Sequence, residues 1–161
     1  MTKTPFYKGM LIATTIIFFD QLSKWWVFGA LSTAPDQKIE VTNFFNLVMV
    51  WNKGISFGLL GSTGYGHIIF SVTSLLIVAI LLNWLWKAHH SLLAIALGLV
   101  IGGAIGNIID RIRLKAVADF LDFYLDSWHW PAFNVADAAI CIGVALLCMD
   151  SLLIKEKEPN E

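Results

Sequence analysis

Residues 67–109 read HIIFSVTSLLIVAILLNWLWKAHHSLLAIALGLVIGGAIGNII, two long apolar runs joined by the four residues KAHH. Each run, 67–86 and 91–109, is long enough to cross about 30 Å of hydrocarbon as a helix. Their apolar residues are continuous rather than alternating, which excludes the strands of a membrane barrel. Because so short a link joins them, the two helices are expected to form a tight antiparallel hairpin.

Two further apolar runs, at about 10–30 and 134–154, bring the predicted number of membrane-spanning helices to four. The composition agrees, since 57% of the residues are hydrophobic and only 14% are charged, against about a quarter charged in soluble domains. Neither internal repeats nor low-complexity tracts occur. We therefore predict an all-α membrane protein, a four-transmembrane-helix bundle formed by a single membrane domain, 1–161.

The two long connections, 31–66 and 110–133, emerge on the same side of this bundle. The first contains KIEVTNFFNLVMVW, residues 38–51, which is rich in β-branched and aromatic residues and partly alternating. It predicts a small β-sheet in the region of about 38–60, in the loop between helices 1 and 2 at the outer membrane surface. A turn at Asn52–Gly54 follows, and the glycines up to Gly66 suggest mobility there.

The charges give a divided signal for orientation. On the side of the termini and the short link lie Lys3, Lys8, Lys87, Lys155 and Lys157. On the other side lie Lys38, Lys53, Arg111, Arg113 and Lys115. We favour both termini in the cytoplasm, because the two arginines crowd a cluster of acids and are interpreted as functional.

Other classes of site and partner find little support. The net charge of −1 argues against a nucleic-acid partner, since there is no basic excess to neutralise phosphates. No spacing of Cys and His is typical of a metal site. Cys141 and Cys148 are expected to be small buried apolar side chains.

Ionisable groups beside or within apolar spans are costly, so each needs a reason. Asp20 and Lys24 are four residues apart, on one helix face, and are interpreted as a structural ion pair. A glycine every fourth residue, at Gly98, Gly102 and Gly106, predicts close approach of another helix. Next to that stripe, Gly103, Asn107 and Asp110 form a polar face, and Arg111 follows it.

Carboxylates at the start of the last span suggest catalysis. Asn134 is placed to cap the helix, and Asp137 in its first turn either caps it as well or faces a polar cavity. The preceding segment offers three more acids, namely Asp119, Asp122 and Asp126. Two carboxylates in close approach share one proton and can activate water against an amide. The residues alone leave the choice among the three acids open.

Five motifs carry a resemblance to a known family. They are Asp20-Gln21-Leu22-Ser23-Lys24, Asn52-Lys53-Gly54-Ile55-Ser56-Phe57-Gly58, the run from Gly102 to Arg111, Val117-Ala118-Asp119-Phe120, and Phe133-Asn134-Val135-Ala136-Asp137. In this order they resemble bacterial lipoprotein signal peptidase (signal peptidase II), an aspartyl intramembrane peptidase family, over essentially the whole chain.

The resemblance implies that the catalytic pair is Asp119 and Asp137. It assigns substrate binding to Asn52, Gly54, Asn107, Arg111 and Asn134. A supporting role falls to Asp20, Lys24 and Asp110.

The implied reaction is hydrolysis of the bond before a diacylglyceryl-modified Cys in a prolipoprotein. No metal or organic cofactor is implied, and the other expected partner is membrane lipid. We expect a monomer in the bacterial inner membrane with its active site toward the outer leaflet. The alternatives are a small transporter or proton-conducting subunit, and a non-enzymatic membrane subunit.

Overall fold

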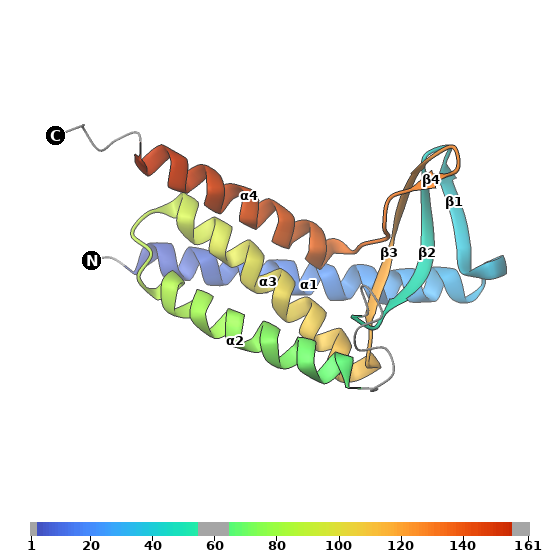
Figure 1. The fold of residues 1–161 in the computed structure, drawn as a ribbon, viewed down its shortest axis with the longest axis horizontal. Coiled ribbons are helices and arrows are strands. Elements are labelled where there is room, and N and C mark those ends of the chain that lie inside the picture. Colours follow the sequence, from blue (N-terminus) through green and yellow to red (C-terminus); the bar gives the residue numbers. More distant parts are fainter. Residues whose placement is uncertain (1–2, 55–64, 156–161) are drawn as a thin grey trace.

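The computed structural model describes residues 3–54 and 65–155, in which four long helices lie along one axis and a sheet stands at one end (Figure 1). The helices are α1 (Thr4–Ser32), α2 (Gly66–Trp86), α3 (Ser91–Leu114) and α4 (Val135–Lys155). Helix α3 is central, because it packs against each of the other three. The start of α1, the α2–α3 turn and the end of α4 share the end of the bundle away from the sheet.

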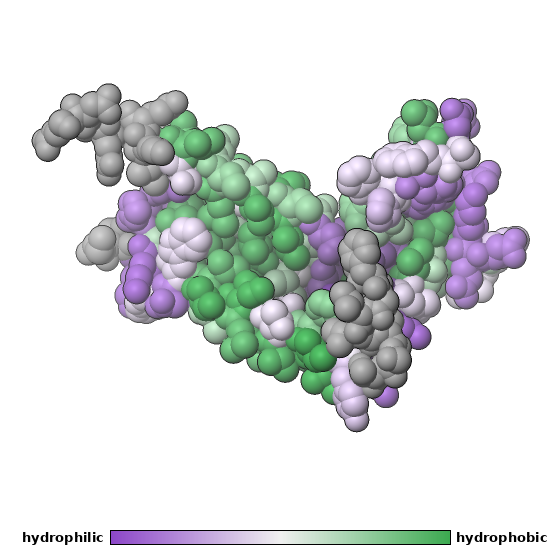
Figure 2. Space-filling model, in the orientation of Figure 1, coloured by the Kyte–Doolittle hydropathy of each residue, from purple (hydrophilic) through white to green (hydrophobic). Residues whose placement is uncertain are grey.

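Three of the described helices are long and apolar enough to cross a membrane, in the ranges Gly66–Trp86, Ser91–Leu114 and Val135–Leu153. Helix α1 is not among them by that measure, so its span stays a prediction. The outer surface of the helices is largely apolar, and hydrophilic residues gather at the two ends (Figure 2).

Helix α3 is longer than predicted, and this places the polar residues at its end. It continues past residue 109 to Leu114 and ends at Lys115, which has a left-handed φ of 60° and donates its N–H to the carbonyl of Arg111. Asp110 and Arg111 therefore belong to the last turns of α3, at the end of the bundle that carries the sheet.

The predicted glycine stripe of α3 faces α1. A Cβ on Gly98 would meet the carbonyl oxygen of Gly9, and one on Gly102 would lie 2.7 Å from that of Ala13. On an adjacent face of the helix, Gly103 allows the same approach by the carbonyl of Ala136 at the start of α4. The close approach predicted from the spacing is confirmed, and it involves two neighbours instead of one.

The sheet takes strands from both long connections. Its four antiparallel strands are β1 (Lys38–Thr42), β2 (Phe45–Asn52), β3 (Val117–Leu125) and β4 (Trp128–His129), in that order. The strands predicted in the first connection are present as β1 and β2. The sheet extends beyond that connection, because β3 of the second connection pairs with β2 and is the longest strand of the sheet. We assigned residues 117–125 to a segment in the interface, but they form strand β3. Its two acids, Asp119 and Asp122, are three residues apart, so they do not show the two-residue period that marks a strand.

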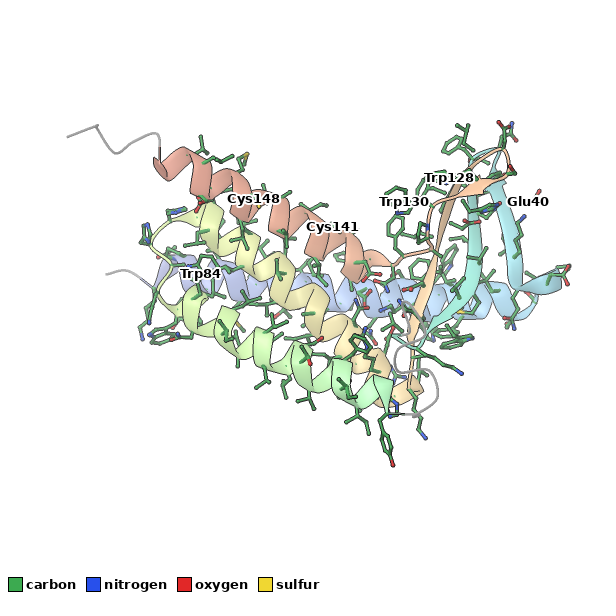
Figure 3. The ribbon with its side chains drawn as sticks, in the orientation of Figure 1. Glu40, Trp84, Trp128, Trp130, Cys141 and Cys148 are labelled. Carbon is green, nitrogen blue, oxygen red and sulfur yellow. The ribbon has the colours of Figure 1, made fainter. Side chains whose placement is uncertain are left out.

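Two other expectations have different outcomes. The expectation that the cysteines are buried was wrong, because Cys141 and Cys148 are both exposed on α4 (Figure 3). They lie on its apolar outer face, where a small apolar side chain is compatible with lipid. The part of the predicted strand region from residue 55 to 60, and the expected mobility at Gly61 and Gly64, lie outside the described residues.

Candidate active site

A buried ion cluster of Asp20, Lys24 and Asp110 lies next to the candidate site. The Lys24 Nζ atom lies 2.8 Å from Oδ2 of Asp20 and 2.8 Å from Oδ2 of Asp110. Backbone N–H groups also bind both carboxylates. Asp20 Oδ1 accepts from the N–H of Ala136 at 3.0 Å, and Asp110 Oδ2, the oxygen that meets Lys24, accepts from the N–H of Ala118 at 3.2 Å. One cluster thus joins α1 and α3 to the start of α4 and to β3. Removing any one of these buried charges would leave the others without a partner. The cluster therefore holds the four elements in fixed positions.

Gln21, which sequence reasoning did not assign, completes this cluster. Its Nε2 donates to Asp20 at 3.1 Å and to Asp110 at 3.0 Å. The signal was present, because Gln21 lies between Asp20 and Lys24 in the first motif.

Asn134 and Asp137 cap α4 reciprocally. The Asn134 Oδ1 atom accepts from the N–H of Asp137 at 2.9 Å, and Asp137 Oδ2 accepts from the N–H of Asn134 at 3.2 Å. The other carboxylate oxygen of Asp137, Oδ1, accepts from the side chain of Asn107 on α3 at 2.8 Å. The capping interpretation of Asp137 is confirmed, and Asp137 also meets a polar partner across the bundle.

Asp119 joins the same network from the sheet. Its Oδ1 accepts from Asn134 Nδ2 at 2.7 Å, and its Oδ2 accepts from Asn52 Nδ2 on β2 at 3.1 Å. The Asn134 amide also lies 3.2 Å from Oδ1 of Asn107. Two side-chain amides, those of Asn134 and Asn107, therefore link the carboxylate of Asp119 to that of Asp137.

The other two acids of the segment lie elsewhere. Asp122 accepts from Asn46 at 2.9 Å and lies 2.8 Å from Nδ1 of His129, within the sheet. It is three residues after Asp119, so the strand turns it to the opposite face. Asp126 is exposed in the turn after β3, with a φ of 52°. Of the three acids, only Asp119 is connected to Asp137.

The two acids of β3 have opposite electrostatic environments. Burial, and next the charge of Asp137, raise the pKa of Asp119 to about 6, although hydrogen bonds from Asn52 and Asn134 oppose the shift. Burial also acts to raise the pKa of Asp122, but hydrogen bonds from Asn46 and His129 lower it overall. A proton is therefore held near Asp119 at a pH where Asp122 is ionised.

The remaining predicted residues border this network. Gly54 has a φ of 77°, donates its N–H to Oδ1 of Asn52 at 2.9 Å, and has no space for a Cβ beside the ring of Phe70. It thereby orients the amide that meets Asp119. Arg111 lies with its guanidinium carbon 5.8 Å from the centre of the same ring. Its buried Nε has no hydrogen-bond partner among the residues that the structure describes.

A cleft of about 440 Å³ opens onto Asp119. It is lined by Val50, Trp51, Asn52, Lys53, Asp119, Pro131 and Ala132. A hydrophilic patch is visible between the bundle and the sheet (Figure 2). The arrangement places Asp119, which is linked to Asp137, beside a cavity of the size that ligands occupy, at the end of an apolar bundle.

Comparisons with known proteins agree with the motifs. A family model described as "Signal peptidase (SPase) II" matches residues 12–153. A protein named lipoprotein signal peptidase from Rhizorhabdus wittichii is 45% identical over 157 residues, which are 95% of this chain and 91% of the relative. One of the same name from Paraburkholderia phytofirmans is 43% identical over 88% of this chain and 82% of its own length.

A solved structure is also similar. It is described as a bacterial membrane enzyme at 2.3 Å resolution and superposes with a TM-score of 0.78 at 29% identity, covering 95% of this chain and 93% of its own. The resemblance inferred from the five motifs is confirmed, and the chain belongs to the signal peptidase II family.

Proposed function

We propose that this chain is a membrane aspartyl endopeptidase that removes the signal peptide from diacylglyceryl-modified prolipoproteins, cutting just before the lipidated Cys. Family membership supports the reaction. The observation that supports the aspartyl mechanism is the link between Asp119 and Asp137 through Asn134 and Asn107. A water molecule held at such a pair has a base on one side and an acid on the other.

The pKa of Asp119 suggests how the shared proton is divided. In this proposal Asp119, with its pKa raised to about 6, has the role of the acid, and Asp137 has the role of the base. Asp137 takes a proton from water as the water oxygen attacks the carbonyl carbon before the lipidated Cys, and Asp119 protonates the carbonyl oxygen. On collapse of the tetrahedral intermediate the C–N bond breaks, Asp137 gives its proton to the leaving amine, and Asp119 takes back a proton from the new carboxyl group.

The substrate-binding roles of Asn52, Gly54, Asn107, Arg111 and Asn134 are part of the proposal. Asn52 lines the cleft, and Asn107 and Asn134 hold the two carboxylates beside which the substrate would bind. The Nε of Arg111 has no hydrogen-bond partner among residues 3–54 and 65–155, so it is a donor that a substrate carbonyl would satisfy.

The proposed setting is the bacterial inner membrane, with α1 as a fourth span. Its 29 residues extend about 43 Å at the rise of an α-helix, more than the hydrocarbon thickness. Its inner charges, Asp20 and Lys24, are 0% and 3% exposed, so lipid meets neither. The termini then lie in the cytoplasm, the sheet lies at the outer surface, and the protein acts as a monomer.

The proposal is tested by hydrolysis of a diacylglyceryl prolipoprotein in detergent by wild type, Asp119→Asn and Asp137→Asn. Both variants should lose cleavage, by about 10³-fold or more, because water then lacks either its base or its acid. Asp122→Asn is the matched control on the same strand and should keep most activity. Substantial cleavage by either of the first two variants would exclude the pair.

The transporter alternative is less well supported. Asp20, Asp110, Asp119 and Asp137 gather at one end of the bundle, whereas a proton relay needs groups distributed through the depth of the membrane.

A further inference from the structure

A second recess lies on the sheet, outside the network of Asp119 and Asp137. We name it the aromatic groove. It has a volume of about 410 Å³, and its walls include Phe44, Phe123, Tyr124, Trp128, Trp130 and Phe133. The rings of Phe123 and Phe133 stack 5.9 Å apart, and those of Trp128 and Trp130 meet edge to face at 5.8 Å.

Large aromatic side chains in this groove are exposed to solvent. Trp128 is 61% exposed and Trp130 is 55% exposed. Aromatic residues in such a cluster are costly to leave in water and mark a binding surface. No side chain that lines the groove carries a formal charge, so its ligand should be apolar.

The aromatic groove shares a wall with the active-site cleft. Within the segment 130–133, Trp130 and Phe133 line the groove, whereas Pro131 and Ala132 line the cleft that holds Asp119. Hydrogen bonds fix this wall: Phe133 and Leu121 exchange backbone bonds of 2.8 and 3.2 Å, and Trp130 donates to the carbonyl of Phe123 at 2.8 Å. The wall leads directly into Asn134, the amide that links the two aspartates.

The groove also lies where the bilayer would reach it. Trp128 and Trp130 belong to the part of the sheet that extends beyond the helices on the side of α4 (Figure 3). The outer face of α4, on the same side of the molecule, is apolar, with Ile142 55% and Val144 46% exposed. A chain leaving the cleft over the shared wall can thus pass along the groove into lipid.

We propose that the aromatic groove is a subsite for an acyl chain of the diacylglyceryl group on the substrate Cys. This rests on the proposed function, in which the lipid is attached to the residue just after the cleaved bond. Because one residue spans about 3.5 Å, the point of attachment lies beside the cleft whenever the bond lies at the aspartates. The shared wall favours the substrate lipid over a phospholipid of the bilayer, since an anchor for bulk lipid needs no connection to the cleft.

Photo-crosslinking tests the occupant directly. The full chain carrying Asp119→Asn is placed in nanodiscs with a diacylglyceryl peptide that bears a diazirine in one acyl chain. After irradiation, adducts should map to residues 123–133, and the unlabelled lipidated peptide should displace them while the same peptide without lipid should not. Adducts confined to other segments would contradict the proposal. So would adducts formed equally by a diazirine-bearing phosphatidylglycerol and not displaced by the lipidated peptide, since bilayer lipid would then fill the groove.

Kinetics give an independent arm. Trp128→Ala and Trp130→Ala should raise KM for a long-chain substrate roughly two- to tenfold, the effect of losing one aromatic contact, with kcat little changed. The advantage of long over short acyl chains should shrink in the same variants. Trp84→Ala is the control, because Trp84 is 45% exposed at the far end of α2 (Figure 3).

The two proposals fail in different ways. If the wild type does not cleave a diacylglyceryl precursor, the proposed function is wrong. If it does, and the tryptophan variants keep the wild-type KM and chain-length preference, only the groove assignment is wrong.

Discussion

At the scale of the residue, the proposed active site depends on amides that hold carboxylates. Asn134 donates to Asp119 and accepts from the backbone of Asp137, so one side chain fixes both acids. Asn52 and Asn107 each hold the far side of one acid. Neutral amides suit this task, because they orient a carboxylate without adding a charge that would remove the shared proton.

The raised pKa of Asp119 predicts the pH dependence of cleavage. Below a pH of about 6 the pair of carboxyl groups keeps its shared proton. Above that pH the proton is lost, and no carboxylic acid remains to protonate the carbonyl oxygen. The rate kcat/KM should therefore fall on the alkaline side with an apparent pKa near 6, which belongs to the pair as a unit. A pH profile from 4 to 9 on a non-ionisable peptide checks this.

Asp122→Asn is again the control for that profile. Its pKa is lowered, so its removal should leave the alkaline limb in place. A profile that stays flat between pH 5 and 8, or a limb that moves in Asp122→Asn, would show that Asp119 does not set it.

At the scale of the element, α3 organises the molecule because glycines let two neighbours approach it. Gly102→Ala places a Cβ 2.7 Å from the carbonyl oxygen of Ala13 and 2.9 Å from Cβ of Ile16. Neither atom can move without shifting α1, so we expect a loss of about 1–3 kcal/mol in the free energy of unfolding. Unfolding by SDS in mixed micelles would measure it.

Gly29→Ala in α1 is the matched control, because a Cβ there meets nothing within 4 Å. Removing a helical glycine where space is open should leave stability unchanged or raise it by about 0.5–1 kcal/mol. Equal losses in the two variants would mean that helix propensity, and not the approach of α1, controls the effect.

At the scale of the whole molecule, the sheet and the α2–α3 turn lie at opposite ends of the bundle (Figure 1). If the helices cross the membrane as proposed, a membrane-impermeant thiol reagent added to intact spheroplasts should label Glu40→Cys. It should label His89→Cys only after permeabilisation. Both positions are exposed, and Glu40 lies on the outermost strand (Figure 3).

The background for this experiment is Cys141→Ala with Cys148→Ala, which removes the two native thiols on α4. The reverse pattern of labelling would place the termini outside and overturn the proposed orientation. Labelling of both positions from one side would instead contradict the proposed spans.

Much of the fold follows from local pattern. The range of α2 and the start of α3 follow from uninterrupted apolar runs, and the cap at Asn134 follows from residue type at a helix start. Strand β3 was not predicted, because its acids, Asp119 and Asp122, indicated a segment in the membrane interface. The pairs Lys24–Asp110 and Asn46–Asp122 could not be predicted from local sequence, because the two residues of each pair are far apart in the chain.

The sequence by itself determined the membrane class, the helices α2 and α3, the glycine seam and, through five motifs, the family. Those features depend on apolar periodicity and residue type, which are local. Only the tertiary structure distinguished Asp119 from Asp122 and Asp126 on physical grounds. The distinction needs the pairing of β3 with β2 and the approach of α4, which bring Asn52 and Asn134 to one carboxylate.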